Sequence, residues 1–426
     1  MFELNHNLNK ILVNTLSNNI DENLKNLSYD DWDYLFNISY YQNVNSCLYY
    51  YLKKNNLLNF IPEDINKKFD TKYKKQTFDN LRIKTELINI IKEFNKNDIP
   101  TIILKGSHLS FFVYESIGMR YARDIDLIVP IDKSKKAFEI AKSLGYMTED
   151  KNDDLDFDFK EENHIQEIFN SNNTCLEIHG YLHKHSKYYN VPIDYLWNNS
   201  QKVFLDKYET NILSINDLIL HLIIHISYQD NFALDLRHYL DIFIVLEKYK
   251  DNIDWDNLIN LSKQFNIKKG VFIVLNIIKI LFNFDFSKDF FEKFELDNIS
   301  LELINYPIDL MWAYNKNSGT QQEYFKYRSS FGGYGDFFEL STGKKITKFL
   351  NKIFISKEEL NRKYGKFEVN KRPYYYYIYN IYGLINKNKF ILNNDSKSNS
   401  FIENTKKSYT INKWILDKSN TMNKNL

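Results

Sequence analysis

The run Asp124-Ile125-Asp126-Leu127-Ile128-Val129 constrains this chain more than any other stretch. Its apolar residues alternate with the two carboxylates, a pattern that predicts a β-strand with Asp124 and Asp126 on one face. No cation in the run pairs with them, so a bound divalent cation is the expected source of balancing charge. Carboxylate oxygens are hard ligands of the kind that suits Mg²⁺. We therefore expect this strand to carry a metal site.

A second strand and a turn precede this run. Residues 101–104 are β-branched and apolar, Lys105-Gly106-Ser107 follows, and residues 108–117 have helical spacing. A strand, a glycine turn and a helix start place backbone N–H groups and the positive helix end where a phosphate can bind. Lys105, Gly106 and Ser107 are therefore predicted phosphate contacts.

Together these segments resemble the DNA polymerase β-like nucleotidyltransferases, whose pattern is Gly-Ser, a helix, and then Asp-x-Asp between apolar residues. More narrowly, Leu-Lys-Gly at 104–106 with Arg120 and the segment 123–127 is similar to a bacterial family of uncharacterised nucleotidyltransferases. The sixteen residues between Ser107 and Asp124 exceed the usual spacing. The resemblance implies an α+β fold, with a small mixed β-sheet core flanked by N-terminal and C-terminal helical regions.

A third acidic residue is expected on a neighbouring strand. Residues 164–170 and 174–182 predict a hairpin around 171–173, and its second strand reads Leu-Glu-Ile-His at 176–179. The resemblance implies that Glu177 is the third carboxylate of the site. The alternative, that Glu177 is simply an exposed residue of the strand, is less favoured. The alternative candidates for the third carboxylate are Asp156 and Asp158, which lie in an acidic stretch that is predicted to be an edge strand or a loop.

Three histidines, His179, His183 and His185, lie close enough in sequence to suggest a zinc site. Their spacing and the absence of a cysteine partner do not match a structural zinc site. His179 is expected to support Glu177 or to line the pocket. His183 and His185 are predicted to lie in a solvated turn. His221 and His225, four apart on an apolar helix, are predicted core or interface residues with a backbone partner.

Two helices are predicted after the sheet, at residues 214–227 and 233–249. Arg237 and Asp241 are four apart on the second, so they are expected to pair on its surface. The resemblance extends here, because family members carry Arg followed four residues later by Asp. It makes Arg237 a candidate for binding phosphate or base. Lys105, Ser107 and Arg120 are the candidates for the β and γ phosphates.

The predicted regions are an N-terminal helical region (1–80), the α+β nucleotidyltransferase core (81–212), a helical domain (213–312), a Gly/aromatic loop with C-terminal helices (313–392) and a loose tail (393–426). Residues 315–345 within the fourth are interpreted as a long ordered loop or lid. A short helix is predicted at 409–417 within the tail.

Charge and cysteine content exclude some classes of function. The 56 basic and 55 acidic side chains give a net charge of +1, which argues against a broadly basic surface for long nucleic acid. Two cysteines, Cys47 and Cys175, are too few for a disulfide framework and indicate a reducing compartment. No signal peptide is recognisable, and the apolar stretches are too short to span a bilayer. We therefore expect a soluble, cytoplasmic protein with no membrane partner.

The resemblance implies an enzyme that moves a nucleoside monophosphate from an NTP such as ATP to an acceptor hydroxyl and releases pyrophosphate. Asp124, Asp126 and Glu177 would hold two Mg²⁺ ions, or Mn²⁺ in their place. The expected acceptor is a small molecule, a peptide or a protein, and the end of a tRNA stays open. Two alternatives remain: a non-catalytic nucleotide- or partner-binding protein on the same fold, and a toxin-like transferase that acts on tRNA.

Overall fold

The computed structural model describes residues 3–148, 163–296, 299–312 and 410–417, except residues 185, 187, 233 and 412. The chain divides into two compact units, Met1–Gln229 with Leu234–Asn298 and Asp230–Ala233 with Ile299–Leu426. Three predictions fall outside the described residues: the acidic stretch around Asp156 and Asp158, the position of His185, and the loop and helices at 313–392.

The first unit contains a seven-stranded mixed sheet in the order β3-β4-β5-β2-β1-β7-β6. The central strand β2 (Asp124–Ile128) pairs antiparallel with β1 (Ile102–Ile103) and parallel with β5 (Cys175–His179). The outer strands are β3 (Met147–Thr148), β4 (Ile168–Phe169), β6 (Gln201–Leu205) and β7 (Tyr208–Ile212). The predicted Asp-x-Asp strand and the predicted hairpin of β4 and β5 are therefore confirmed.

The two faces of β2 and β5 differ in chemistry because side chains alternate along a strand. Ile125 and Leu127 on β2, with Leu176 and Ile178 on β5, point into an apolar core that includes residues of helices α4 and α6. The alternate residues carry the carboxylates on the opposite face. The buried apolar face fixes the register, because a slip by one residue would bury the acids instead.

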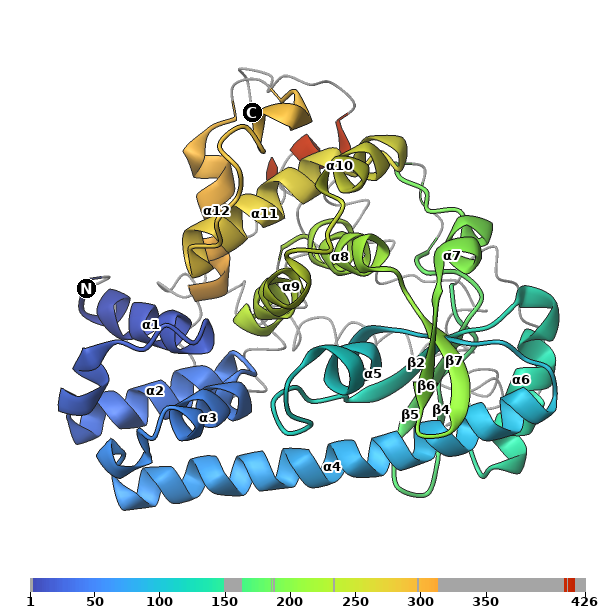
Figure 1. Cartoon of the computed structure of the whole chain (residues 1–426), viewed down its shortest axis with the longest axis horizontal. Coiled ribbons are helices and arrows are strands. Elements are labelled where there is room, and N and C mark those ends of the chain that lie inside the picture. The colour runs from blue at the N-terminus through green and yellow to red at the C-terminus, as the bar shows by residue number, and fades with distance from the viewer. Residues whose placement is uncertain are drawn as a thin grey trace, which may run out of the picture. The chain divides into compact units, whose positions relative to one another are not determined.

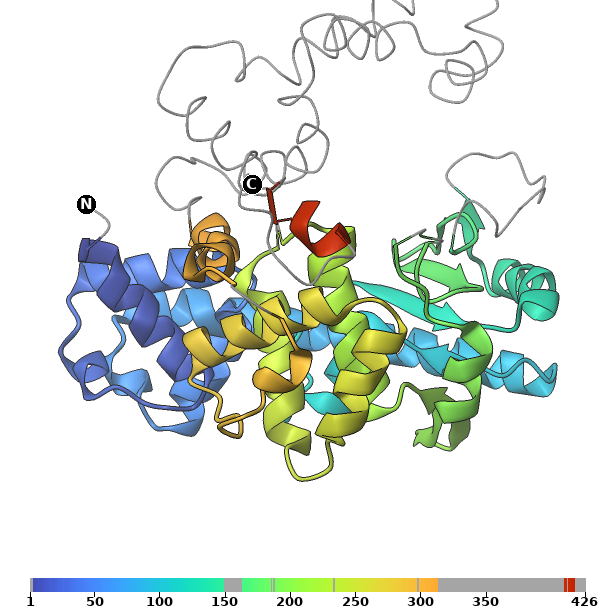
Figure 2. The same cartoon turned by 90° about the horizontal axis from the view of Figure 1, so that it is seen from above.

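The N-terminal residues form helices α1 (Glu3–Leu16), α2 (Tyr29–Tyr41), α3 (Asn45–Lys54) and the 34-residue α4 (Glu63–Lys96). The predicted cap of α2 is present as a capping box between Ser28 and Asp31. Figures 1 and 2 show α4 running from α1–α3 to the sheet. Its apolar residues from Ile83 to Phe94 cover the sheet, and the helix continues without a break through residue 80.

The helix before β2 differs from its prediction at both ends. It begins at Lys105 rather than after Ser107, as α5 (Lys105–His108), and continues as one π-helical turn, Leu109–Val113. The sequence also predicts a helix at residues 132–144 that ends at Gly145, and it is confirmed as α6 (Ser134–Ser143), with Gly145 at φ +91°. Only glycine adopts this φ without a steric penalty, which explains the stop.

The remaining helices of the first unit are α7 (Ile193–Asn199), α8 (Ile215–Ile224), α9 (Leu236–Tyr249), α10 (Trp255–Gln264) and α11 (Lys268–Phe282). A π-helical turn, His225–Gln229, extends α8. In the second unit the structure describes α12 (Leu301–Trp312) and helical residues between 410 and 416, within the predicted short helix. No helix of the described part is both long and apolar enough to cross a membrane.

Candidate active site

The parallel pairing of β2 and β5 sets Asp126 directly beside Glu177. Asp124 lies on the same face of β2, two residues before Asp126, and is half-buried. The Asp126 side chain has no exposed surface, whereas that of Glu177 is 13% exposed. Oxygens of Asp126 and Glu177 and a ring nitrogen of His179 all lie within 4.8 Å of one another. The structure thus brings together acids from two separate segments, β2 and β5, that the sequence predicted to share one site.

Lys105 supplies a positive charge directly between two of these acids. Its Nζ lies 2.5 Å from Asp126 Oδ1 and 3.3 Å from Glu177 Oε2. Burial lowers the pKa of Lys105, but the charges of Asp126 and Glu177 outweigh it, so the net shift is upward. The backbone of Lys105 has φ +44°, a left-handed conformation that is uncommon for a residue other than Gly, Asn or Asp.

His179 approaches the same two oxygens from β5. Its Nε2 lies 3.0 Å from Asp126 Oδ1 and 3.1 Å from Glu177 Oε2, while the Asn163 amide donates to Nδ1 at 3.1 Å. Since Nδ1 accepts a hydrogen bond, the ring proton lies on Nε2 and faces the carboxylates. Burial lowers the pKa of His179, and the hydrogen bonds to Asp126 and Glu177 more than offset it. His179 therefore supports Glu177, as predicted, and Asp126 as well.

The second oxygen of Asp126, Oδ2, is buried and has no hydrogen-bond partner among the described residues. A buried carboxylate oxygen of this kind is costly unless something binds it. Burial raises the pKa of Asp124 to about 6, and the negative charge of Asp126 adds to the shift. For Asp126, burial acts in the same direction, but the charge of Lys105 and the hydrogen bond from His179 hold its pKa well below the usual range. Carboxylate oxygens suit a hard divalent cation, and Asp124 adds a second carboxylate on the same face of β2.

Ser107 and Gly106, both predicted phosphate contacts, have different surroundings. The Ser107 side chain is buried and donates to the carbonyl oxygen of Asp124 at 3.2 Å, so it anchors the helix to β2. Gly106 lies so close to the segment that precedes β2 that an added Cβ would be 3.3 Å from Ala122 Cα. Of the two, Gly106 lines the cleft beside the carboxylates and Ser107 is not among its lining residues.

This cleft has a volume of about 160 Å³ and opens between β2, α5, α8 and α9. Its charged lining residues are Lys105, Arg120, Arg123, Asp124, Arg237 and Asp241, and Leu109, Leu222, His225 and His238 complete most of the wall. Four basic side chains against two acidic ones favour an anionic occupant. The structure thus places Lys105, Gly106, Arg120 and Arg237 around one cleft, as the sequence proposed.

Arg120 makes a buried ion pair with Asp241, and the predicted surface pair of Arg237 with Asp241 is wrong. Arg120 Nε lies 2.8 Å from Asp241 Oδ1 and its Nη2 lies 2.9 Å from Oδ2. Tyr114 donates its hydroxyl to the same Oδ1 at 2.8 Å. Asp241 faces inward from α9 because it belongs to the helix face that packs toward Leu109–Val113. Helical spacing identifies neighbours along one helix but not which side faces a partner.

Arg237 lies at the rim of the cleft, next to Asp235 and His238. Its Nε is 3.7 Å from Asp235 Oδ1, and its Nη2 is 3.2 Å from His238 Nε2. Arg123, directly before Asp124, is exposed to solvent at the opposite wall. From the sequence alone, Arg123 is expected to neutralise the carboxylate strand structurally and not to bind phosphate. Both guanidinium groups face an opening large enough for a phosphate.

His183, which follows β5, is not in a solvated turn. His183 is buried, accepts a hydrogen bond at Nδ1 from Gln229 at 3.0 Å, and has Nε2 3.5 Å from His221 Nδ1. His221 is in the core, as predicted, but its contact is with His183 and not with a backbone group. His225 lines the cleft instead. The turn prediction was wrong because sequence spacing does not reveal that α8 covers this loop.

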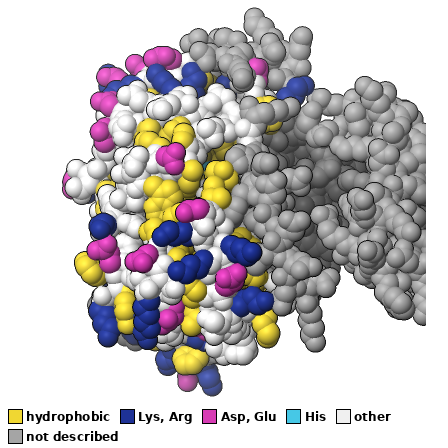
Figure 3. Space-filling model, turned by 90° about the vertical axis from the view of Figure 1, so that its right-hand side faces the viewer, with side chains coloured by type: hydrophobic (Ala, Val, Ile, Leu, Met, Phe, Trp, Pro, Cys, Tyr) yellow, Lys and Arg dark blue, Asp and Glu magenta, His cyan; other side chains and the backbone are white. Residues whose placement is uncertain are grey.

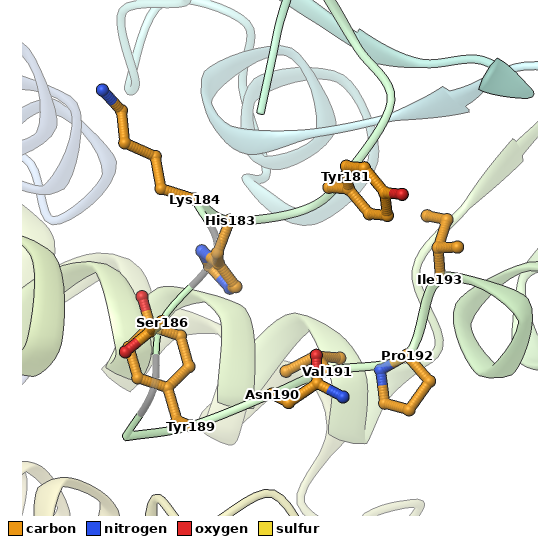
Figure 4. A pocket seen from close by; sticks show the side chains of 9 residues that line it. All are labelled: Tyr181, His183, Lys184, Ser186, Tyr189, Asn190, Val191, Pro192 and Ile193. Carbon is orange, nitrogen blue, oxygen red and sulfur yellow. The ribbon is translucent and has the colours of Figure 1, made fainter. Parts of the chain in front are cut away.

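A smaller cavity of about 90 Å³ lies beside His183, between residues 181–186 and 189–193. Figure 4 shows its nine lining side chains, none of which is acidic. Without a carboxylate, this cavity offers no ligand set for a hard cation. The candidate active site is therefore the cleft beside Asp124 and Asp126.

Comparison with known proteins agrees with this geometry. Residues 28–283, more than half of the chain, match a family described as uncharacterised nucleotidyltransferase. Neither the curated proteins nor the solved structures include a match to this chain. The matched range runs from the N-cap of α2 to the end of α11 and includes all seven strands of the sheet. The chain belongs to this nucleotidyltransferase family.

Proposed function

We propose that this nucleotidyltransferase moves a nucleoside monophosphate from an NTP to an acceptor hydroxyl. The bond from the acceptor oxygen to the α-phosphorus forms, the bond from that phosphorus to the bridging oxygen of the β-phosphate breaks, and pyrophosphate leaves. The observation that carries the proposal is the convergence of Asp126 and Glu177, with Asp124 two residues before Asp126 at a cationic cleft and Asp126 Oδ2 buried and unpaired among the described residues.

Asp124 and Asp126 would hold a divalent cation, Mg²⁺ or Mn²⁺, through the unpaired Oδ2 and the neighbouring carboxylate. When bound, the cation neutralises phosphate charge and polarises the α-phosphoryl group toward attack. His179 and Lys105 keep the Asp126 carboxylate in place through its other oxygen. The aspartate pair is thus presented to a ligand in one fixed orientation, which lowers the entropic cost of binding.

The cleft side chains support a triphosphate site on the other side of the aspartates. Arg123 and Arg237 would bind the β- and γ-phosphates, because guanidinium groups match phosphate oxygens in pairs. Arg120 also lines the cleft, but its Nε and Nη2 are engaged by Asp241. Arg120 therefore positions the helical wall that carries Arg237 more than it binds phosphate.

Glu177 would accept the proton of the incoming hydroxyl. Its side chain is partly exposed, unlike that of Asp126, and it lies directly across from Asp126 in the strand pairing. The nucleophile must reach the α-phosphorus on the side away from the leaving pyrophosphate. An acceptor that approaches Glu177 meets this requirement if the pyrophosphate points toward Arg123 and Arg237.

The surface supports a compact acceptor, such as a small molecule, a peptide or a protein. On the face shown in Figure 3, basic and acidic side chains are mixed around a streak of hydrophobic ones. Long nucleic acid favours clustered positive charge, and the chain carries a net charge of only +1. The end of a tRNA is tested as an acceptor in the same experiment.

The test is transfer of label from α-³²P-labelled NTPs, with Mg²⁺, to components of a cell extract or to tRNA. We expect Asp126→Asn to reduce transfer by at least about 100-fold, because it removes a charged ligand from the reacting centre. Asp132→Asn, in the exposed segment after the same strand, is the matched control and should retain activity. Nucleotide binding by the wild-type protein without pyrophosphate release would contradict catalysis and favour the binding-protein alternative.

A further inference from the structure

The two oxygens of Asp126 have different surroundings. Oδ1 contacts two nitrogen atoms, Lys105 Nζ at 2.5 Å and His179 Nε2 at 3.0 Å. Glu177 Oε2 contacts the same two nitrogens, at 3.3 Å and 3.1 Å. Oδ2 of Asp126 has no such contact within the described part of the chain. The oxygens of Asp126 and Glu177 that face these donors are therefore occupied, whereas Asp126 Oδ2 is a buried oxygen without a partner among the described residues.

We propose that Lys105 is a resident cation that replaces one of the two divalent ions expected from the sequence. The ammonium group stays between Asp126 and Glu177, and the active site takes up a single divalent ion with the nucleotide, at Asp124 and Asp126 Oδ2. This inference rests on the proposed nucleotidyl transfer and specifies its cation requirement. It also changes the role of Lys105, which the sequence assigned to the β- and γ-phosphates.

The local charge balance agrees with one ion. Three ionised carboxylates and one ammonium group sum to a formal charge of −2, which a single divalent cation neutralises. A second divalent ion between Asp126 and Glu177 would lie next to the Lys105 ammonium, where like charges repel strongly at short range. Lys105 would have to leave a pocket in which both of its partners are partly or wholly buried.

The backbone of Lys105 provides an independent observation. Most non-glycine residues with positive φ in the described part of the chain are Asn or Asp, and Lys105 is one of three exceptions. Such strain persists where surrounding contacts hold the residue in place. A lysine that only reached into solvent for phosphate would not need it. The strained backbone begins α5 and directs the side chain at the carboxylates rather than into open solvent.

The other position for a metal, Asp126 with Glu177 and His179, is less suitable. The Asn163 amide donates to His179 Nδ1, so Nε2 carries the proton and cannot bind a metal in that form. Together with Lys105 Nζ, this N–H already satisfies the oxygens that a second ion would use. His179 and Lys105 thus donate to Asp126 Oδ1 and Glu177 Oε2, and the divalent ion would bind at Asp124 and Asp126 Oδ2 instead.

The test counts Mn²⁺ ions per protein by electron paramagnetic resonance, in the presence of α,β-methylene analogues of the four common NTPs. These analogues bind without being cleaved, so the count does not depend on turnover. We expect one bound Mn²⁺ in the wild-type protein and two in Lys105→Met, in which the second position loses its ammonium group. Lys105→Arg, which keeps a cation, should hold one. Lys96→Met removes an exposed lysine of α4 and should also hold one.

Two Mn²⁺ ions in the wild-type protein, or equal counts in the wild-type protein and a folded Lys105→Met variant, would overturn the inference. Thermal unfolding establishes that each variant is folded, and Lys105→Arg provides the second variant if Lys105→Met is not. If Lys105→Arg binds two ions, the inference is also overturned. The label-transfer assay distinguishes failure of this inference from failure of the proposed nucleotidyl transfer. Transfer with two ions per wild-type protein rejects only the role of Lys105 as a resident cation. No Mn²⁺ in any variant and no transfer reject the proposed function as well.

Discussion

His179 is the residue that most directly links the strand pairing to the chemistry. It stands two residues after Glu177, so both side chains project from the same face of β5. Its ring spans the gap to Asp126, and Asn163 fixes which nitrogen carries the proton. A buried donor placed in this way holds two carboxylates together that would otherwise repel each other.

Replacement of His179 tests this role. His179→Leu should lower the transfer rate at saturating NTP by about 10- to 100-fold, the range seen when a residue that orients a ligand is lost. His179→Gln should recover part of the rate, because the amide retains an N–H donor. The Michaelis constant for NTP should change little, since the cleft arginines are intact. Equal rates for the Leu and Gln variants would show that the hydrogen bonds do not matter.

Among the individual site residues, the sequence identified the acids but not the side chains that pair with them. Asp124 and Asp126 followed from strand alternation, and Glu177 from the family pattern of a third acid. The ion pair of Lys105 depends on where a helix starts relative to a strand that follows it by almost twenty residues, so no local pattern predicts it. Ser107 turned inward for the same reason: its hydroxyl meets the Asp124 carbonyl only after β1 and β2 have paired.

Among the elements, α9 is tied to the catalytic sheet by one buried cluster. Asp241 on α9 accepts hydrogen bonds from Arg120 and Tyr114, which both lie between α5 and β2. Asp241 is 1% exposed, so loss of its carboxylate leaves a buried guanidinium group without its counter-ion. This cluster sets the position of the wall that carries Arg237.

Asp241→Ala should therefore lower the free energy of unfolding by about 3–5 kcal/mol, the usual cost of removing one member of a buried ion pair. Asp251→Ala, at an exposed position just after α9, is the control and should change it by less than about 0.5 kcal/mol. The double variant Arg120→Met/Asp241→Leu should recover much of the loss, because no buried charge remains. Urea unfolding measures all three. A loss below 1 kcal/mol for Asp241→Ala would contradict the buried cluster.

What the sequence did not predict depends on partners far along the chain. A strand was predicted at residues 101–104, where β1 lies, but not that its two residues join β2 to β7 in the sheet. The β6–β7 hairpin turns at Asp206-Lys207, without the Asn-Gly or Asp-Gly signal typical of such turns. Its place is fixed instead by β1 and by a buried contact between Thr101 and Thr210 at 2.8 Å. In contrast, α2 and α6 were predictable because their caps and apolar spacing are local.

For the whole molecule, buried histidines couple folding to pH. Burial lowers the pKa of His108 to about 3, with a contribution from Lys248, and lowers that of His238 to about 4. Burial likewise holds the pKa values of His183 and His221 well below the usual range. In the unfolded chain these side chains take up protons near pH 6.5, whereas in the folded protein they stay neutral. Below that pH the unfolded state binds more protons, so stability must fall as pH falls.

We expect the free energy of unfolding to decrease between pH 6.5 and 5, by about 1.4 kcal/mol per pH unit for each such histidine. His179 acts with the opposite sign, because its pKa is raised, but its contribution is gained mainly above pH 6.5 and changes the slope between pH 6.5 and 5 little. Urea unfolding at pH 7, 6 and 5 gives the slope, and His108→Gln should make it shallower by about one proton equivalent. A flat profile across this range would show that these histidines are protonated in the folded protein, and the packing of α8 and α9 against the loop after β5 would then need another explanation.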